Sequence, residues 1–401
     1  MSQQLLLVTK VASVDSYVRK TLQNRDEFED DPFTVVNLSD IQERFEEWKK
    51  EFPEVEPFFA VKAQHNANTL KLLADNGCGF DVASLGELES VVEAGVPAER
   101  ILYAQPYKQL SHLLYAMERD IISVCDSVDE IEKIGELSAR MNLNPRILIR
   151  ILPDDKESDS QASLSTKFGA PLRILDDLMK AATNHKVTVV GISFHVGSHC
   201  HSAEPYLNTL RLSRVWWDRV VGEHGAQLQV LDIGGGYPGE GGPDFKIMTG
   251  QINSGIEEHY GDIRRDIRII AEPGRYMVTS SLSVVTNVIA EKGNTCGVLG
   301  RGEDELDSAV QINGAEDVTP ESDQEKEPAR MVFWGPTCDS SDRLIDGYHV
   351  PGIKRGDWIV FPDLGAYCSN IMTTFNGFAH PKMHFVHTDM HGEKIEQFFH
   401  R

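Results

Sequence analysis

A carboxylate, a glycine and an arginine stand together where an apolar run ends. The run covers residues 267–271 and leads directly into Glu272-Pro273-Gly274-Arg275. We predict a buried strand that stops at a tight turn and delivers these groups to one point. Two other segments are expected to converge there, one with a lysine and one with three glycines, at residues 59–62 and 231–236.

Together these segments offer the partners that pyridoxal 5'-phosphate (PLP) requires. Lys62 could form a Schiff base with an aldehyde, although a lysine at the start of a loop commonly only faces solvent. Gly234-Gly235-Gly236 could let backbone N–H groups approach a phosphate, or could simply form a flexible turn. Glu272 could pair with a protonated ring nitrogen.

Other polar side chains follow predicted strands. His195 and Ser198 end the sixth apolar run, where an imidazole could stack on a flat ring and a hydroxyl could bind a phosphate. A single histidine at a strand end is more often structural. Asp81 and Glu87 flank the end of the second run and could equally be ordinary acids at the start of a helix. Arg275 adds a fixed positive charge after the eighth run.

A cysteine stands among turn residues in the segment 334–342, with Asp339 directly after it. Buried cysteines are commonly inert, so reactivity of this Cys338 thiol is the less common outcome when the residue is considered alone. A further turn with a polar tip is predicted at Tyr367.

Eight short apolar runs position these residues. They cover 58–62, 79–84, 101–105, 121–126, 146–152, 187–196, 228–234 and 267–272, and amphipathic helical patterns usually follow them. Continuous apolar strands that alternate with helices indicate a parallel sheet covered on both faces. Eight units favour a closed (β/α)8 barrel over the alternative, a doubly wound open sheet. Barrel enzymes place their chemistry at the carboxyl ends of the strands.

The helical alternation fails after residue 280. Strand-like runs at 282–290, 331–334 and 357–361 predict an all-β C-terminal domain. We expect an N-terminal segment, 1–40, whose strand near Val35 joins the sheet of that domain. The barrel should then cover 41–280 and the β domain 281–401. Residues 302–328 are strongly acidic, which predicts a disordered, solvated loop.

Composition argues against several classes of function. The formal net charge of −23 argues against a nucleic-acid partner, because phosphate binding needs a basic surface. The six cysteines are scattered without a CxxC pair, so we expect no metal or disulfide framework and reduced thiols in the cytoplasm. The sequence has no apolar segment long enough to predict a secretory signal or a membrane span.

A series of motifs in one order resembles the eukaryotic ornithine decarboxylases, PLP enzymes of the alanine-racemase-like fold. The resemblance covers about residues 32–378 through PFFAVKAQHN, GFDVAS, TKFGA, FHVGSHC, LDIGGGYPG, AEPGRY, FWGPTCDSSDR, GDWIVF, LGAY and TFNGF. It implies PLP-dependent decarboxylation of L-ornithine to putrescine and CO2, the entry step of polyamine biosynthesis.

The resemblance also implies roles for individual residues. The lysine of the AVK motif, here Lys62, holds the cofactor. The residues implied around the cofactor ring are Asp81, Glu87, Arg150, His195, which stacks on it, and Glu272, which pairs with its nitrogen. The implied phosphate binders are Ser198, Gly235, Gly236, Gly274 and Arg275, assisted by Tyr367.

In this family Cys338 and Asp339 would reach the active site of the other subunit, which implies an obligate homodimer with two shared sites. Cys338 would return a proton to Cα after CO2 departs, and Asp339 would hold the distal amine of ornithine. The related diaminopimelate decarboxylases usually carry Glu at the position of Asp339, which favours a diamino-monocarboxylate substrate. Lysine and arginine remain open as alternatives to ornithine.

One strand of the family, just before GPTCD, has no counterpart in this sequence. Residues 291–330 include no aromatic side chain, and Glu272 and Cys338 are 66 positions apart, closer than the family norm. The missing strand carries an acid that helps to bind the distal amine. Its absence is the basis of an alternative, a non-catalytic homologue that binds antizyme, the regulator of the decarboxylase, as the antizyme inhibitors do.

Overall fold

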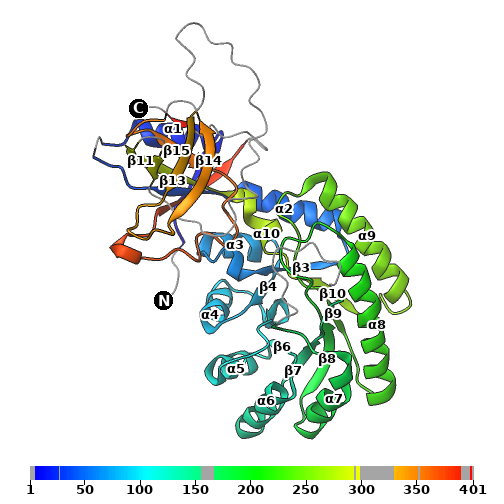
Figure 1. Ribbon diagram of the computed structural model, residues 1–401. Coiled ribbons are helices and arrows are strands. Elements are labelled where there is room, and N and C mark those ends of the chain that lie inside the picture. The colour runs from blue at the N-terminus through cyan, green and yellow to red at the C-terminus, as the bar shows by residue number, and fades with distance from the viewer. Residues whose placement is uncertain are drawn as a thin grey trace. The chain divides into compact units, whose positions relative to one another are not determined.

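The computed structural model describes residues 5–26, 28–154, 167–292, 295–298, 329–350, 353–389 and 398–399. The chain forms two compact units (Figure 1). One unit is built on Ile41–Val278, and the other combines Leu6–Asp40 with Thr279–Arg401. The acidic segment 302–328 lies outside the described residues.

The first unit contains a closed barrel of parallel strands in the order β10-β3-β4-β5-β6-β7-β8-β9. The strands are β3 (Glu56–Ala60), β4 (Gly79–Val82), β5 (Ile101–Tyr103), β6 (Ile122–Cys125), β7 (Arg146–Arg150), β8 (Thr188–Ser193), β9 (Val230–Asp232) and β10 (Arg268–Ala271). Each predicted apolar run therefore overlaps a barrel strand, and all but the first, 58–62, contain the whole strand. This confirms the (β/α)8 barrel and excludes the open sheet.

Helices alternate with the barrel strands (Figure 1). They are α2 (Leu38–Glu51), α3 (Ala67–Asp75), α4 (Leu85–Glu93), α5 (Leu110–Met117), α6 (Val128–Met141), α7 (Leu175–Asn184), α8 (Glu204–His224), α9 (Gly242–Tyr260) and the short α10 (Arg275–Val278). Strand side chains such as Phe58, Leu148 and Ile270 pack into one buried core cluster. Because the strands are held by this core, their carboxyl ends are fixed points for functional side chains.

The second unit is a mixed sheet in the order β1-β16-β2-β11-β12-β13-β14, with β15 paired to β11 and β17 to β15. Its strands are β1 (Val8–Val11), β2 (Phe33–Asn37), β11 (Leu282–Lys292), β12 (Thr295–Val298), β13 (Ala329–Trp334), β14 (Arg343–Val350), β15 (Trp358–Phe361), β16 (Lys382–Thr388) and β17 (Phe398–Phe399). The N-terminal strand β2 pairs antiparallel with β11, with Val35 opposite Ser283. This confirms that the N-terminal strand joins the C-terminal sheet.

The N-terminal segment contributes more than the expected strand. It also forms β1, which pairs in parallel with β16, and the helix α1 (Val14–Gln23). Val18 of α1 packs into a core cluster with Phe33, Val285 and Trp358, so α1 covers part of the sheet. None of the helices in the described ranges is both long and apolar enough to cross a membrane.

Candidate active site

Lys62 and Asp81 meet at the carboxyl ends of two neighbouring barrel strands. Lys62 lies in the 3-10 turn Val61–Ala63 directly after β3, and Asp81 lies in β4. The Lys62 Nζ donates a hydrogen bond to Asp81 Oδ2 at 2.6 Å. The Asp81 side chain is 1% exposed and the Lys62 side chain 43%. A charge-assisted bond to a buried acid therefore holds the amine while its side chain still reaches solvent.

Glu272 directly follows β10 and is 5% exposed. Its backbone N–H donates to the carbonyl oxygen of Gly234 at 2.7 Å, which joins the turn after β10 to the glycine-rich loop after β9. Burial raises the pKa of Glu272 well above its usual range, and the charges of Asp232 and Asp81 raise this pKa further. A cationic ring nitrogen opposite Glu272 would reverse this effect and favour the carboxylate.

Asp232, the last residue of β9, was not selected from the sequence. It is fully buried and accepts hydrogen bonds from Ser193 Oγ at 2.7 Å and from the Gly234 N–H at 2.9 Å. Burial raises the pKa of Asp232 to about 6, and a hydrogen bond with Glu272 opposes that shift. Burial and the charge of each neighbour thus disfavour the state in which both Asp232 and Glu272 are ionised. The position of Asp232 near the end of the seventh apolar run is the sequence signal that could have identified it.

His195 and Arg150 lie at the ends of adjacent barrel strands. The Nδ1 of His195 accepts a hydrogen bond from the Gly197 N–H at 3.0 Å, which assigns its proton to Nε2. Desolvation lowers the pKa of His195 well below its usual value, and the charges of Arg150 and Lys62 act in the same direction. The ring is therefore neutral near pH 7. Arg150 is 7% exposed and lies 5.2 Å from the centre of the Phe168 ring.

The loops after β8, β9 and β10 form a cradle of small residues and donors. A Cβ at Gly236, where φ is +118°, would lie 2.5 Å from a neighbouring carbonyl oxygen, so only glycine fits there. Arg275 donates from Nη2 to Ser198 Oγ at 3.2 Å. Gly235 and Gly274 lie in the loops after β9 and β10. Backbone N–H groups, a hydroxyl and a guanidinium are suitable partners for a phosphate.

Glu87 has a structural role at the start of α4. Its Oε2 accepts a hydrogen bond from the Ala83 N–H at 2.6 Å, and the Ser84 Oγ accepts one from the Glu87 N–H at 3.3 Å. Ser84 therefore caps the helix, and the Glu87 carboxylate binds the backbone of the residue before this cap. Burial raises the pKa of Glu87. A role of Glu87 beside a cofactor stays a prediction.

Cys338, Asp339 and Tyr367 belong to the second unit. Cys338 is exposed, and its backbone N–H donates to Asn376 Oδ1 at 2.8 Å. The Oδ1 of Asp339, also exposed, accepts hydrogen bonds from the Ser341 N–H at 2.9 Å and from its Oγ at 2.8 Å. Tyr367 has a backbone φ of +59°. The loop between β13 and β14 thus presents a thiol and a carboxylate at the surface of its unit.

A second missed acid, Asp342, anchors that loop from inside. Asp342 is 2% exposed, and its Oδ2 accepts a hydrogen bond from the Thr337 N–H at 3.0 Å. The Gly335 N–H donates to the Asp342 carbonyl oxygen at 2.8 Å. The loop around Cys338 therefore closes around a buried carboxylate. The sequence contains both acids, Asp339 and Asp342, but does not distinguish the buried one from the exposed one.

The closed parallel barrel brings an amine, buried acids and donors for an anion to the carboxyl ends of its strands. This is where (β/α)8 enzymes carry their active sites. The family described as "Pyridoxal-dependent decarboxylase, pyridoxal binding domain" matches residues 38–279. The chain belongs to this family of PLP-dependent amino-acid decarboxylases, and the family resemblance of its motifs is confirmed.

Similar proteins cover nearly the whole chain. Ornithine decarboxylase of Caenorhabditis elegans is 35% identical, over 92% of this chain and 91% of the relative. Antizyme inhibitor 2 of Xenopus laevis is also 35% identical, over 89% of this chain and 81% of the relative. The arginine decarboxylase of Paramecium bursaria Chlorella virus superposes with a TM-score of 0.82 at 27% identity, over 93% of this chain and 100% of the viral one.

The cofactor of this family is PLP, and the residues of the first unit fit it. A protonated ring nitrogen is the counter-ion that the buried Glu272 requires in order to ionise. The Ser198 hydroxyl and the Arg275 guanidinium, 3.2 Å apart beside the glycine-rich loop after β9, are donors of the kind that a phosphate needs. Within the described part of the chain, the Oδ1 of Asp81 is buried without a hydrogen-bond partner, so this acid can accept a further bond beside that from Lys62.

Proposed function

We propose that this chain catalyses the PLP-dependent decarboxylation of L-ornithine to putrescine and CO2, the entry step of polyamine biosynthesis. The observation that carries the proposal is the convergence of Lys62, Asp81 and the buried Glu272 on the adjacent strands β10, β3 and β4. Similarity to an ornithine decarboxylase over nearly the whole chain supports the choice of substrate.

Bound PLP would supply an electron sink for the electron pair left at Cα when the carboxylate departs. In this proposal Lys62 holds the cofactor through Nζ, which Asp81 orients. Glu272 keeps the ring nitrogen protonated, and the neutral His195 stacks on the ring. Arg150 and Glu87 lie near the cofactor. The proposed phosphate partners are Ser198, Gly235, Gly236, Gly274, Arg275 and Tyr367.

The loop after β13 would complete the site from a second subunit. Cys338 would give a proton to Cα, and Asp339 would accept hydrogen bonds from the distal ammonium of ornithine. Two observations support this assignment: the loop presents both side chains at the surface of its unit, and Asp342 holds its backbone in place. The proposed assembly is a homodimer with two shared sites.

The test is release of CO2 from carboxyl-labelled ornithine by the purified protein with PLP. Lysine and arginine serve as comparison substrates, because the missing family strand leaves the choice among the three open. Release that is fastest with ornithine and absent in Lys62→Ala would support the proposal. Faster release of CO2 from lysine or arginine would instead identify that amino acid as the substrate. No release from any of the three, with PLP bound normally, would contradict decarboxylation by this chain.

A second candidate function is regulation through antizyme. Two observations favour it: the similarity to an antizyme inhibitor and the absence of the family strand that helps to bind the distal amine. In that case the purified chain should bind antizyme while releasing no CO2 from ornithine. A chain that releases CO2 and fails to bind antizyme would remove this alternative.

A further inference from the structure

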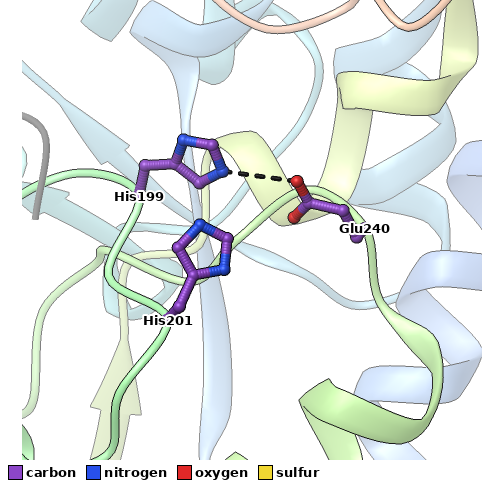
Figure 2. Close-up of side chains that lie close together, drawn as sticks. All are labelled: His199, His201 and Glu240. Atoms are coloured by element: carbon purple, nitrogen blue, oxygen red, sulfur yellow. Dashed lines mark hydrogen bonds and ion pairs between the residues drawn. The ribbon is translucent and has the colours of Figure 1, made fainter. Parts of the chain in front are cut away.

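Two histidines and a glutamate gather beside the proposed phosphate cradle. His199 and His201 lie in the loop between β8 and α8, and Glu240 lies in the loop between β9 and α9. His199 Nε2 and Glu240 Oε1 are 3.3 Å apart. The two imidazole rings have centres 4.4 Å apart at an angle of 47°. Figure 2 shows the rings one above the other, with the Glu240 carboxylate reaching towards them from the neighbouring loop.

The three groups have the chemistry and spacing of metal ligands. One ligand atom from each residue lies within 4.8 Å of the others. In a tetrahedral Zn²⁺ site with bonds of about 2.0–2.2 Å, neighbouring ligand atoms are roughly 3.3–3.6 Å apart, close to the separation already present between His199 and Glu240. His201 and Glu240 are exposed, so small rotations of their side chains can bring the third atom into range.

We propose that His199, His201 and Glu240 form a binding site for a Zn²⁺-class transition-metal ion. Two imidazoles and one carboxylate are an established ligand set for Zn²⁺, with a fourth position left for water. The sequence contains no CxxC pair and therefore predicted no metal site. The ion would join the loop of Ser198 to the loop of Gly235 and Gly236, and so fasten together two sides of the cradle.

The surroundings of His199 determine the metal affinity that we expect of the site. His199 is 5% exposed, so packing holds its ring in place. Its Nδ1 is buried without a hydrogen-bond partner among the described residues. Metal-bound histidines usually donate this second N–H, and loss of such a partner commonly weakens binding about 10- to 100-fold. We therefore expect Zn²⁺ binding in the micromolar range rather than tighter.

A second cluster of possible ligands provides a matched control. Asp176, Glu223 and His224 also bring ligand atoms together, but Arg219 already pairs with both acids of that cluster. A cation there would have to compete with the guanidinium. Substitution of His224 therefore removes an imidazole from the chain without touching the proposed site.

The experiment measures Zn²⁺ binding by titration calorimetry and by equilibrium dialysis with metal analysis. It uses the full-length, PLP-loaded protein after removal of any affinity tag. Wild type and His224→Ala should each bind one equivalent with the same micromolar affinity. His201→Ala and Glu240→Gln should each weaken binding by at least about tenfold. Both variants change exposed side chains, so circular dichroism should show an unchanged fold.

In the Zn²⁺ measurements, either of two results overturns the proposal. One is a wild type that takes up no Zn²⁺ at concentrations up to roughly 100 µM, well above the expected range. The other is uptake that His201→Ala and Glu240→Gln leave unchanged, or that only His224→Ala removes. As a further measurement, Co²⁺ bound to wild type should show a visible absorption band that is lost in His201→Ala. Retention of that band would also contradict the assignment.

Discussion

The barrel site and the loop around Cys338 hold their reactive groups in different ways. In the barrel, Asp81, Asp232 and Glu272 are at most 5% exposed, and their partners come from several strands. In the second unit, Cys338 and Asp339 are exposed, and only the loop's anchor is buried. In the barrel, burial therefore raises the pKa of Asp232 and of Glu272, whereas the loop leaves its thiol and carboxylate in contact with solvent.

This difference indicates what each region needs in order to act. Buried acids in close proximity are unfavourable as carboxylates until a cation joins them, so the barrel site is suited to a cationic ring. An exposed thiol and carboxylate on an anchored backbone are suited to dock onto another surface. Substitutions that remove the amine, the thiol, the buried acids or the loop's anchor can each test this contrast.

The largest effect should come from Lys62. Lys62→Ala removes the amine that would hold PLP, so the reconstituted protein should lose its visible absorption band and roughly 10³-fold or more of its CO2 release from ornithine. Absorbance spectra and labelled-substrate assays measure both. The matched control is Lys71→Ala, a surface lysine of similar exposure, 45% against 43%. A normal band in Lys62→Ala would contradict the cofactor assignment.

Mixed dimers test whether the two regions act across a subunit boundary. Cys338→Ala and Lys62→Ala should each be poorly active alone. An equal mixture should recover up to about a quarter of wild-type activity, because half of the dimers are mixed and each of these has one intact site. The assay is CO2 release after dissociation and reassociation. No recovery, with mixed dimers demonstrated, would sink the shared-site proposal.

The acid pair should give the cofactor-free protein a distinctive pH dependence. The pKa of Asp232 is about 6 in the folded protein against an ordinary 3.8, so the folded state binds more protons between these values. Stability should therefore fall as the pH rises through this window. In Asp232→Asn this contribution disappears.

Urea unfolding at about pH 4.5 and pH 7 measures this contribution. Wild type should lose about 1–3 kcal/mol relative to Asp232→Asn as the pH rises. Asp262→Asn is the control, because the pKa of this exposed acid is shifted in the opposite direction: hydrogen bonds from Arg214 lower it and outweigh the effect of burial. A difference between wild type and Asp232→Asn that is independent of pH would show that the carboxyl pair is not protonated as described.

The smallest effects should separate the two acids of the Cys338 loop. Asp342→Asn weakens a buried acceptor of the loop backbone and should cost about 1–3 kcal/mol of stability. Asp339→Asn changes an exposed side chain and should cost less than about 0.5 kcal/mol. Thermal or urea unfolding of both variants makes the comparison. Equal losses would mean that burial of Asp342 does not anchor the loop.

The order of the barrel and the positions of many site residues could be predicted from the sequence. Strands buried on both faces of a parallel sheet are continuous apolar runs, and eight such runs stand out between helical patterns. Polar residues just after a run, such as Lys62, His195 and Glu272, must lie at the carboxyl edge of the barrel. Periodicity and chain order carry this information, so it needs no knowledge of contacts.

Only the tertiary structure decided which groups face one another. The pairing of Asp232 with Glu272 depends on neighbouring strands of a closed barrel, and the burial of Asp342 depends on how one loop folds back on itself. The meeting of His199, His201 and Glu240 requires two loops separated along the chain by the whole of α8. The physical reason is that pKa shifts and ligand sets depend on distances of a few ångströms, and chain closure sets these distances while residue spacing does not.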